Sequence, residues 1–518
     1  MISQPNGLDL LLFLATLGVA AAMLIYARSR KRSTLPYPPG PKRLPVLGNL
    51  LDIPTSFEWE TYARWGKEYD SDILHLNTAG NDFVILNSLK AATDLLEKRS
   101  AKYSNRPQFT MVTELMGWKW VMSALQYGER WRERRRAFAK YFHANNSSQW
   151  RAPQMEFVRK MLPRFLDTPE DCLAITKHAV GGMALSIAYG LPIRSSNDPL
   201  LDLVERAVAA VSDAAVPGAF WVDIFPILKY VPEFFPGTGF MRKAKVWRKM
   251  QVDMRDMPFQ QTIRNMVSGI AKPSFTSTSL QNLDESRDLR HQQEVIQDTA
   301  AVIFAGGADT TVSTIHTFFN AMLSFPETHK KAQEELDRVL GGRLPEFGDE
   351  ADLPYVSAIV KELLRWKPVT PIALPHCSTE DDVYQGYHIP KGSIVIPNVW
   401  AMLHDEDIYS NPSTFNPDRF MKDGLLDPSV RDPGSMAFGF GRRICPGNQV
   451  GLSFLWLTVA TILATFDVTK VLDEDGTAIE PSVQYQSSII CHPLPFRCTL
   501  KPRSKAAEEL IRSTADSY

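Results

Sequence analysis

The sequence predicts a mainly α-helical protein with a small β-sheet region, built as one large domain. Helical spacing and good helix formers recur along the chain, most clearly in residues 88–100, 130–142 and 327–341. Residues alternate in polarity around a turn in segments 72–87 and 382–398, which predicts short strands. The 518 residues contain no Gly/Ser linker and no internal repeat. One large core is therefore expected.

The N-terminus carries an uncharged run, residues 10–26, followed at once by a basic cluster at residues 28–32. The run has about the minimum length that spans a bilayer as a helix. A cleaved signal peptide is the alternative, but no Lys or Arg precedes the run, and basic residues stand where cleavage would occur. We expect an uncleaved, single-pass transmembrane anchor with residues 1–9 in the lumen and the body in the cytosol.

The anchor is followed by a basic and proline-rich hinge, residues 27–50. Proline removes a backbone donor and disfavours helix in the residue before it, so the hinge is expected to be stiff and extended. Residues 51–500 form the folded body, in which the polar segment 268–291 is predicted to be a surface connection. Residues 501–518 are charged and are expected to form a frayed polar tail.

Charge and cysteine content argue against several classes of protein. The formal net charge is -1, whereas a nucleic-acid partner usually requires a basic surplus, so no nucleic acid is expected as partner. The five cysteines are odd in number and show no CxxC or Cys/His zinc spacing. A disulfide framework and a zinc site are therefore not expected, and a reducing compartment fits better.

One cysteine lies in an unusual loop, "FGFGRRICPG". A single cysteine is most often a small buried hydrophobe. Here, however, glycines allow the backbone to fold closely around Cys445, and Pro446 suits the first turn of an apolar helix predicted over residues 447–466. Backbone N–H groups and a helix N-terminus stabilise a thiolate. Because no second Cys or His lies nearby in the sequence, the pattern indicates a metal held by one protein ligand within a macrocycle such as haem.

The pattern of this loop resembles the haem-binding signature of the cytochrome P450 family. The resemblance implies the cytochrome P450 fold with a catalytic domain over residues 51–500, haem b as cofactor, and Cys445 as the axial ligand of its iron. The matching positions are Phe438, Gly441, Arg443, Cys445 and Gly447.

A second motif is the ExxR spacing of Glu362 and Arg365 in "KELLRWKP". An isolated pair of this kind is most often a surface ion pair. In the family, however, the Glu–Arg pair is locked to an arginine of a later motif, which matches Arg419 in "NPDRF". The family more often has Glu at the position of Asp418. The resemblance implies that Glu362, Arg365 and Arg419 hold the core behind the haem.

A third motif is the predicted helix "AVIFAGGADTTVSTIH", residues 301–316, with two adjacent glycines. Each glycine costs about 1 kcal/mol relative to Ala, so either another group approaches Gly306 and Gly307 or the helix distorts there. A close crossing of two helices is the structural alternative. The segment resembles the oxygen-binding helix of the family, which implies that Gly306 adjoins the cofactor, that Thr310 holds dioxygen by hydrogen bonds and that Asp309 relays protons.

Four residues resemble the family's partners of the haem propionates. Trp131 and Arg135 have the WxxxR spacing, His376 lies in "ALPHCS", and Arg443 lies in the cysteine loop. The other basic residues of segment 130–136 are expected to form a solvated face that can receive an acidic electron-transfer partner.

The resemblance is closest to microsomal-type fungal members that hydroxylate aromatic or polyketide metabolites. It implies a haem-thiolate monooxygenase of the endoplasmic reticulum membrane, which inserts one atom of dioxygen into a small apolar substrate such as an aromatic, polyketide or terpenoid compound. The sequence has no evident dinucleotide loop. Electrons from NADPH are therefore expected through NADPH–cytochrome P450 reductase, with cytochrome b5 as a second donor.

Two alternatives stay open: a haem-thiolate isomerase or dehydratase that does not use dioxygen, and a non-catalytic haem-binding protein of the membrane. The Asp309–Thr310 pair speaks against both. The sequence does not identify the substrate. By position in the family, the expected substrate contacts are Val302, Thr370, Ile372, Ala373 and Ile489.

Overall fold

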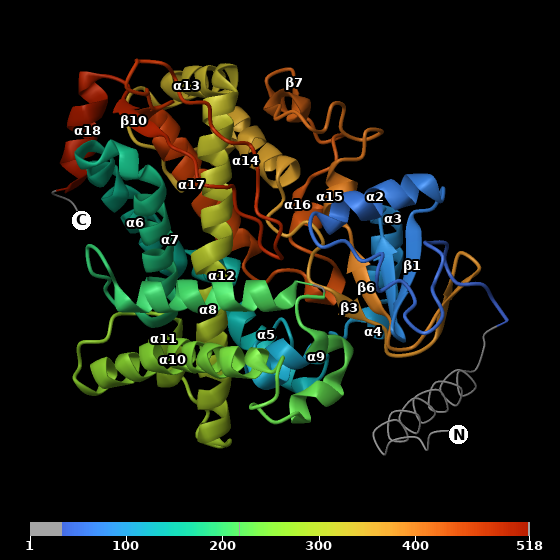
Figure 1. Ribbon diagram of the computed structural model, residues 1–518. Helices are drawn as coiled ribbons and strands as arrows, with labels where there is room; N and C mark the ends of the chain where they lie inside the picture. Colours follow the sequence, from blue (N-terminus) through green and yellow to red (C-terminus); the bar gives the residue numbers. More distant parts are fainter. Residues whose placement is uncertain (1–33, 217, 516–518) are drawn as a thin grey trace, which may run out of the picture.

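The computed structural model describes residues 34–216 and 218–515, so the expected anchor at residues 10–26 lies outside the described residues. Helices dominate the molecule, as predicted, and a four-stranded sheet lies at one side of the helical body (Figure 1). The longer helices are α2 (Glu58–Glu68), α5 (Glu129–Tyr141), α6 (Ser147–Asp167), α7 (Cys172–Tyr189), α8 (Pro199–Ala215), α10 (Gly239–Val267), α12 (Leu289–Ser324), α13 (Pro326–Leu340), α14 (Pro354–Trp366), α17 (Asn448–Thr465) and α18 (Lys505–Ala515).

The four-stranded sheet has the order β1-β2-β6-β3. The first two strands form the antiparallel hairpin predicted over residues 72–87, with Ile73 opposite Leu86, and its turn uses Ala79 and Gly80 in left-handed conformations. The segment predicted over 382–398 supplies strands to two sheets, because β4 pairs with β5 while β6 runs parallel to β2. The strands are β1 (Ile73–Thr78), β2 (Asn81–Leu86), β3 (His376–Cys377), β4 (Asp382–Tyr384), β5 (Tyr387–Ile389), β6 (Ile394–Pro397), β7 (Met421–Lys422), β8 (Leu425–Leu426), β9 (Phe466–Thr469) and β10 (Thr499–Pro502).

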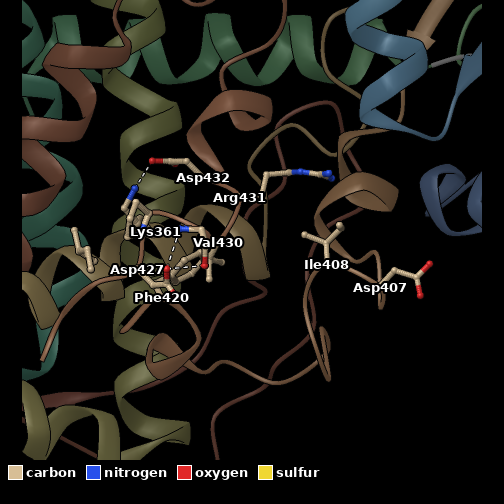
Figure 2. A pocket seen from close by; sticks show the side chains of 11 residues that line it. Lys361, Asp407, Ile408, Phe420, Asp427, Val430, Arg431 and Asp432 are labelled. Atoms are coloured by element: carbon tan, nitrogen blue, oxygen red, sulfur yellow. Dashed lines mark hydrogen bonds and ion pairs between the residues drawn. The ribbon is translucent and has the colours of Figure 1, made fainter. Parts of the chain in front are cut away.

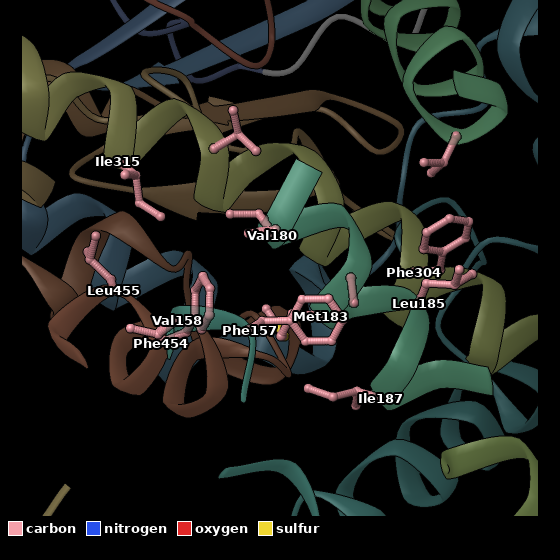
Figure 3. Packing of buried hydrophobic residues seen from close by; sticks show 14 of the residues in the cluster. Phe157, Val158, Val180, Met183, Leu185, Ile187, Phe304, Ile315, Phe454 and Leu455 are labelled. Atoms are coloured by element: carbon pink, nitrogen blue, oxygen red, sulfur yellow. The ribbon is translucent and has the colours of Figure 1, made fainter. Parts of the chain in front are cut away.

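The main core surrounds α12, which packs along α7 and also contacts α17. Figure 3 shows apolar side chains from α6, α7, α12 and α17 meeting in this core, among them Val158, Met183, Phe304 and Phe454. Both α7 and α17 are apolar on most of their surface, as expected of helices that are covered on all sides. Among the described residues, segments 169–189 and 448–465 are long and apolar enough to cross a membrane, but most of each is buried inside the body.

The C-terminal segment differs from the expected frayed tail. Strand β10 pairs with β9, and α18 then contacts α6. Ile511 is fully buried and Thr514 nearly so, whereas the charged residues of α18 face outward. Composition alone suggested a solvated tail, whereas the pairing of β10 and the buried face of α18 dock this segment on the body.

Two other segments contain more structure, or a different structure, than expected. The polar segment 268–291 includes α11 (Phe275–Gln281), which begins with a Ser274–Ser277 capping box and buries Phe275 completely. Segment 88–100, predicted as one helix, is helical from Leu89 to Lys98, but its second part, Thr93–Lys98, is a wider π-helix. The short helices are α3 (Leu89–Ala92), α4 (Ser100–Tyr103), α9 (Trp221–Ile224), α15 (Val399–Leu403) and α16 (Gly434–Ala437).

Candidate active site

The cysteine loop is built as its glycines predict. Gly439 and Gly441 both have positive φ angles, of 78° and 56°. A Cβ at Gly441 would lie 2.2 Å from the carbonyl oxygen of Leu96, so no larger residue fits there without a shift of the backbone. The backbone N–H of Cys445 donates to the carbonyl of Phe438 at 2.8 Å. The loop therefore closes on itself and presents Cys445 just before α17 begins.

The surroundings of Cys445 act on its thiol in opposite directions. Burial raises the pKa of the Cys445 thiol, whereas a hydrogen bond from the Gly447 backbone and the positive charge of Arg135 lower it. Burial is the largest of these effects, so the pKa is raised overall. A metal ligand must be a thiolate, so binding of iron at Cys445 would release the thiol proton.

Helix α5 connects this loop to α12 through two adjacent residues. Arg135 donates from Nη1 to the carbonyl of Ile444 at 2.7 Å. Arg134, which is almost fully buried, donates from Nη2 to Oδ2 of Asp298 on α12 at 2.6 Å. The predicted cofactor partner Arg135 is thus held beside Cys445 by its own helix.

The predicted propionate partners Arg443 and Trp131 contact each other. The guanidinium carbon of Arg443 lies 4.8 Å from the centre of the Trp131 ring, a cation–π contact. Arg443 also donates from Nε to the carbonyl of Ser104 and from Nη2 to that of Leu125, each at 2.7 Å. Its side chain is therefore fixed in a buried position.

Arg106 is a further cation of this region that sequence reasoning missed. It donates to the carbonyls of Leu374 and Pro375 at 2.6 and 2.7 Å, while its buried Nε has no hydrogen-bond partner among the described residues. Burial, together with the charge of Arg443, lowers the pKa of Arg106 to about 9. Its motif, "KYSNRP", gave no signal for this role, because only burial distinguishes Arg106 from the other basic residues.

His376 completes a cluster of three groups with Arg106 and Arg443. Its Nδ1–H donates to the carbonyl of Tyr103 at 2.7 Å. Burial and the charges of Arg106 and Arg443 lower the pKa of His376 well below its usual value. Two buried guanidinium groups beside a neutral imidazole are an environment that would stabilise a doubly anionic group. The residues present therefore fit haem b: Cys445 would ligate its iron, and this cluster would hold its carboxylates.

The three structural residues meet as expected. Glu362 and Arg365 form a fully buried bidentate pair, with Nε to Oε2 and Nη2 to Oε1 both at 2.7 Å. Arg419 approaches the same carboxylate, with Nε 3.1 Å from Oε2. Asp418 instead binds Lys331 at the surface. The shorter acid at this position therefore takes no part in the buried triad.

The two glycines of α12 have different surroundings. A Cβ at Gly307 would lie 3.3 Å from the Cβ of Ala184, so this glycine allows α7 to cross closely. Gly306 is exposed, and in the described part of the chain no atom from another element lies within 4 Å of where its Cβ would be. The helix continues through both, and Thr310 donates from Oγ1 to the Gly306 carbonyl at 2.8 Å. Asp309 lies 3.3 Å from Nε2 of His492, a partner that sequence reasoning did not identify.

The expected substrate contacts fall into two groups. Val302, Thr370 and Ile489 are half-buried. Ile372 and Ala373 are buried, 2% and 6% exposed, in apolar clusters around the four-stranded sheet. All five assignments stay predictions.

A separate hollow of about 600 Å³ lies beside α14, lined in part by residues 426–432 (Figure 2). Lys361 reaches toward Asp432 across it and forms an ion pair. Its lining includes neither cysteine nor histidine. The hollow therefore offers no thiolate or imidazole ligand for a haem iron and is distinct from the site around Cys445.

Comparison with known proteins agrees with this geometry. The family model for cytochrome P450 matches residues 38–500. A cytochrome P450 monooxygenase of Rhodocybe pseudopiperita is 45% identical over 98% of this chain and 98% of its own length. Tryptamine 4-monooxygenase of Psilocybe cyanescens is 42% identical over 96% of this chain and 98% of its own length. The resemblance inferred from the cysteine loop is confirmed, and the chain belongs to the cytochrome P450 family, whose haem is held by a cysteine thiolate.

Proposed function

We propose that this monooxygenase oxidises a small apolar organic molecule at the endoplasmic reticulum membrane, with electrons that pass from NADPH through NADPH–cytochrome P450 reductase. Aromatic, polyketide or terpenoid compounds of secondary metabolism are the proposed substrates. The relative named as a tryptamine 4-monooxygenase supports an aromatic substrate.

The observation that carries the proposal is the arrangement at Gly306. The exposed glycine leaves space beside α12, the Thr310 hydroxyl is anchored on its carbonyl, and the Asp309 carboxylate follows directly. A hydroxyl and a carboxylate beside open space can hold and pass on protons for dioxygen reduction. An isomerase, a dehydratase or a haem carrier has no need of this pair.

The proposed substrate class rests on the apolar residues near this helix. Val302 and Ala305 lie on α12 close to Gly306, and both are only partly buried. Phe109, from the segment before α5, is likewise partly buried against the same core. These side chains favour an uncharged ligand, since they supply apolar surface and no counter-ion.

Each residue of the site has a defined task in the proposed mechanism. Haem, when bound, supplies the iron chemistry that activates dioxygen. The Gly447 N–H and Arg135 would stabilise the Cys445 thiolate, while the Arg106–Arg443–His376 cluster would hold the carboxylates of the cofactor. Thr310 keeps a hydroxyl beside Gly306, and Asp309 transfers protons from the protein surface toward it.

Exposed apolar side chains support contact with a membrane. They gather in the segment between α8 and α10, around α9, and a smaller group lies in the hinge and directly after it. The described part of the hinge is also tied to the sheet region, because the carbonyls of Pro36 and Pro39 accept from the backbones of His388 and His75. The most exposed apolar residues of the two groups are Val46, Leu51, Trp221, Ile227, Tyr230 and Phe234.

The basic face of α5 supports an acidic electron donor, although part of its charge is already neutralised. Arg132 and Arg136 both pair with Glu129, and Arg130 lies 3.6 Å from Glu294. Arg442, in the cysteine loop, is exposed. We therefore place the donor, the reductase or cytochrome b5, over Arg442 and the neighbouring end of α5.

Reconstitution of the holoenzyme with NADPH–cytochrome P450 reductase in lipid vesicles tests the proposal. A library of uncharged aromatic and terpenoid compounds is first screened for spectral shifts on binding, with tryptamine included as a cationic comparison. A binder should stimulate consumption of NADPH and dioxygen and yield a product that carries one atom from labelled dioxygen. Product formation without dioxygen would indicate an isomerase or dehydratase, and binding without any turnover would indicate a carrier.

A further inference from the structure

The segment 482–492 runs along one face of α12. Asn320 donates to the carbonyl of Ser482 at 2.6 Å, and the hydroxyls of Tyr485 and Thr317 lie 3.0 Å apart. Ser313 donates to the carbonyl of Cys491 at 2.5 Å. The helix positions 309, 313, 317 and 320 recur at helical spacing, so these contacts share one face of α12. Three anchors therefore fix this segment along the helix up to His492.

The last contact along this face joins two titratable side chains. Nε2 of His492 lies 3.3 Å from Oδ2 of Asp309, and the two side chains are 23% and 20% exposed. A carboxylate is an acceptor when ionised, so His492 is the donor in this contact. His492 thus contacts both solvent and the carboxylate that precedes Thr310.

Other titratable groups face this pair from neighbouring elements. His316, on the same face of α12, donates to the carbonyl of Leu173 through Nε2, and burial lowers the pKa of His316 to about 4. His316 is therefore neutral near pH 7. Lys177 of α7 acts on His316 by its charge and is paired with Glu205 of α8. Among the described residues, His492 is the group that forms an ion-pair contact with Asp309.

We propose that His492 is a positioning residue that delivers protons to Asp309 and sets the pH dependence of coupled turnover. This inference rests on the proposed function. A proton passes from Nε2 of the imidazolium to Oδ2 of Asp309, which leaves a neutral imidazole and a carboxylic acid. Asp309 then gives its proton toward the Thr310 hydroxyl, and His492 regains one from solvent. Imidazole is suited to this task because it exchanges protons between pH 5 and 8.

Two substitutions distinguish the hydrogen bond that His492 donates from the proton transfer proposed for it. They are His492→Gln and His492→Phe. The Gln amide can donate to Asp309 but does not titrate, whereas Phe removes the donor. We measure product formed per NADPH in the reconstituted holoenzyme from pH 6 to pH 8.5. In the wild type this ratio should fall as the pH rises. In His492→Gln it should be flat and stay near the wild-type level at pH 8.5, with substrate binding unchanged.

A thermodynamic cycle provides a readout that does not depend on turnover. The free energy of unfolding is measured for the wild type, His492→Gln, Asp309→Asn and the double variant. The two single effects should be non-additive, because each substitution changes one partner of the same contact. Additive effects would overturn the contact itself.

His291→Gln is the matched control, because His291 also lies on α12 and pairs with a carboxylate, Glu133, at 3.1 Å. It should leave the pH profile unchanged. If the wild type turns over and His492→Gln keeps the wild-type pH profile, the role of His492 is wrong and the proposed function stands. If the wild type forms no oxygenated product with any binder, the proposed function itself fails, and the cycle still reports on the contact.

Discussion

The guanidinium of Arg443 lies 4.8 Å from the centre of the Trp131 ring and donates to the carbonyls of Ser104 and Leu125. One side chain thus connects the cysteine loop to α5 and to the chain before it. With Arg106 it gathers two buried positive charges in one place, beside the neutral imidazole of His376. This cluster would stabilise the carboxylates of a bound haem.

Cys445→Ala should abolish the thiolate Soret band of the reduced carbon monoxide complex, because the substitution removes the sulfur that the loop presents. Absorbance spectra of the purified, reduced protein measure this. Cys377→Ala is the control, since Cys377 is also half-buried but lies in β3. A thiolate spectrum that survives Cys445→Ala would mean that another ligand holds the iron.

Arg106→Met should weaken haem retention, because Arg106 is one of the two buried guanidinium groups of the cationic cluster. We expect a loss of about 2–5 kcal/mol in haem binding, typical for removal of one partner of a buried charge pair. Transfer of haem to an apoglobin acceptor measures the loss. Arg99→Met is the control, because Arg99 pairs with Asp382 near the surface. Equal haem loss in both variants would contradict the assignment of Arg106.

Glu362→Gln should lower the free energy of unfolding by about 3–5 kcal/mol, because it leaves the buried guanidinium groups of Arg365 and Arg419 without a counter-charge. Urea unfolding monitored by circular dichroism measures the change. Asp418→Asn removes a surface partner of Lys331 and should cost less than about 1 kcal/mol. Similar losses in the two variants would show that the triad has no special structural role.

The burial of His404 predicts that the protein loses stability in mild acid. Burial, aided by the charge of Arg365, lowers the pKa of His404 to about 3 from its usual 6.5. The unfolded chain therefore binds more protons than the folded chain between pH 6.5 and 3. The contribution of His404 to the free energy of unfolding is consequently present above pH 6.5 and is lost as the pH falls. Between pH 6.5 and 5 this loss is about 1.5 kcal/mol.

His404→Asn isolates this contribution, because Asn can still donate to the Trp400 carbonyl, as Nδ1 of His404 does, but does not titrate. The difference in unfolding free energy between the wild type and this variant, measured at pH 6.5 and pH 5, should narrow by about 1.5 kcal/mol. A constant difference would mean that His404 titrates normally in the folded protein.

Thr310→Ala should retain haem and substrate binding but divert NADPH consumption to hydrogen peroxide, because the hydroxyl beside Gly306 is lost. The measurement is peroxide and product formed per NADPH. Thr314→Ala, one turn further along α12, is the control. Wild-type product yield in Thr310→Ala would contradict the proposed relay.

We expect Asn145 and Asn146 to carry no glycan despite their glycosylation sequons. In the predicted topology the body lies in the cytosol, whereas the glycosyltransferases act in the lumen. Protein from microsomes, treated with an endoglycosidase, should show no mobility shift. A shift that disappears in Asn145→Gln or Asn146→Gln would place the body in the lumen and exclude the reductase partnership.

Local sequence signals predicted the parts of the fold that local contacts determine. The hairpin of β1 and β2, helices α13 and α17 and the cysteine loop all follow from periodicity, glycine and proline. Arg106 and His492 could not be identified this way, because their roles depend on burial and on partners more than 150 residues away in the chain. Helix α18 was missed for the same reason: its docking depends on the apolar surface that α6 offers, which its own composition does not reveal.

The neighbouring contacts of Arg134 and Arg135 have a mechanical consequence. Arg134 binds α12 through the carboxylate of Asp298, and Arg135 binds the cysteine loop through the carbonyl of Ile444. A small translation or rotation of α5 would therefore displace α12 and the cysteine loop at the same time. A partner that binds to the exposed face of α5 would then affect the position of the Cys445 sulfur and the position of α12 together.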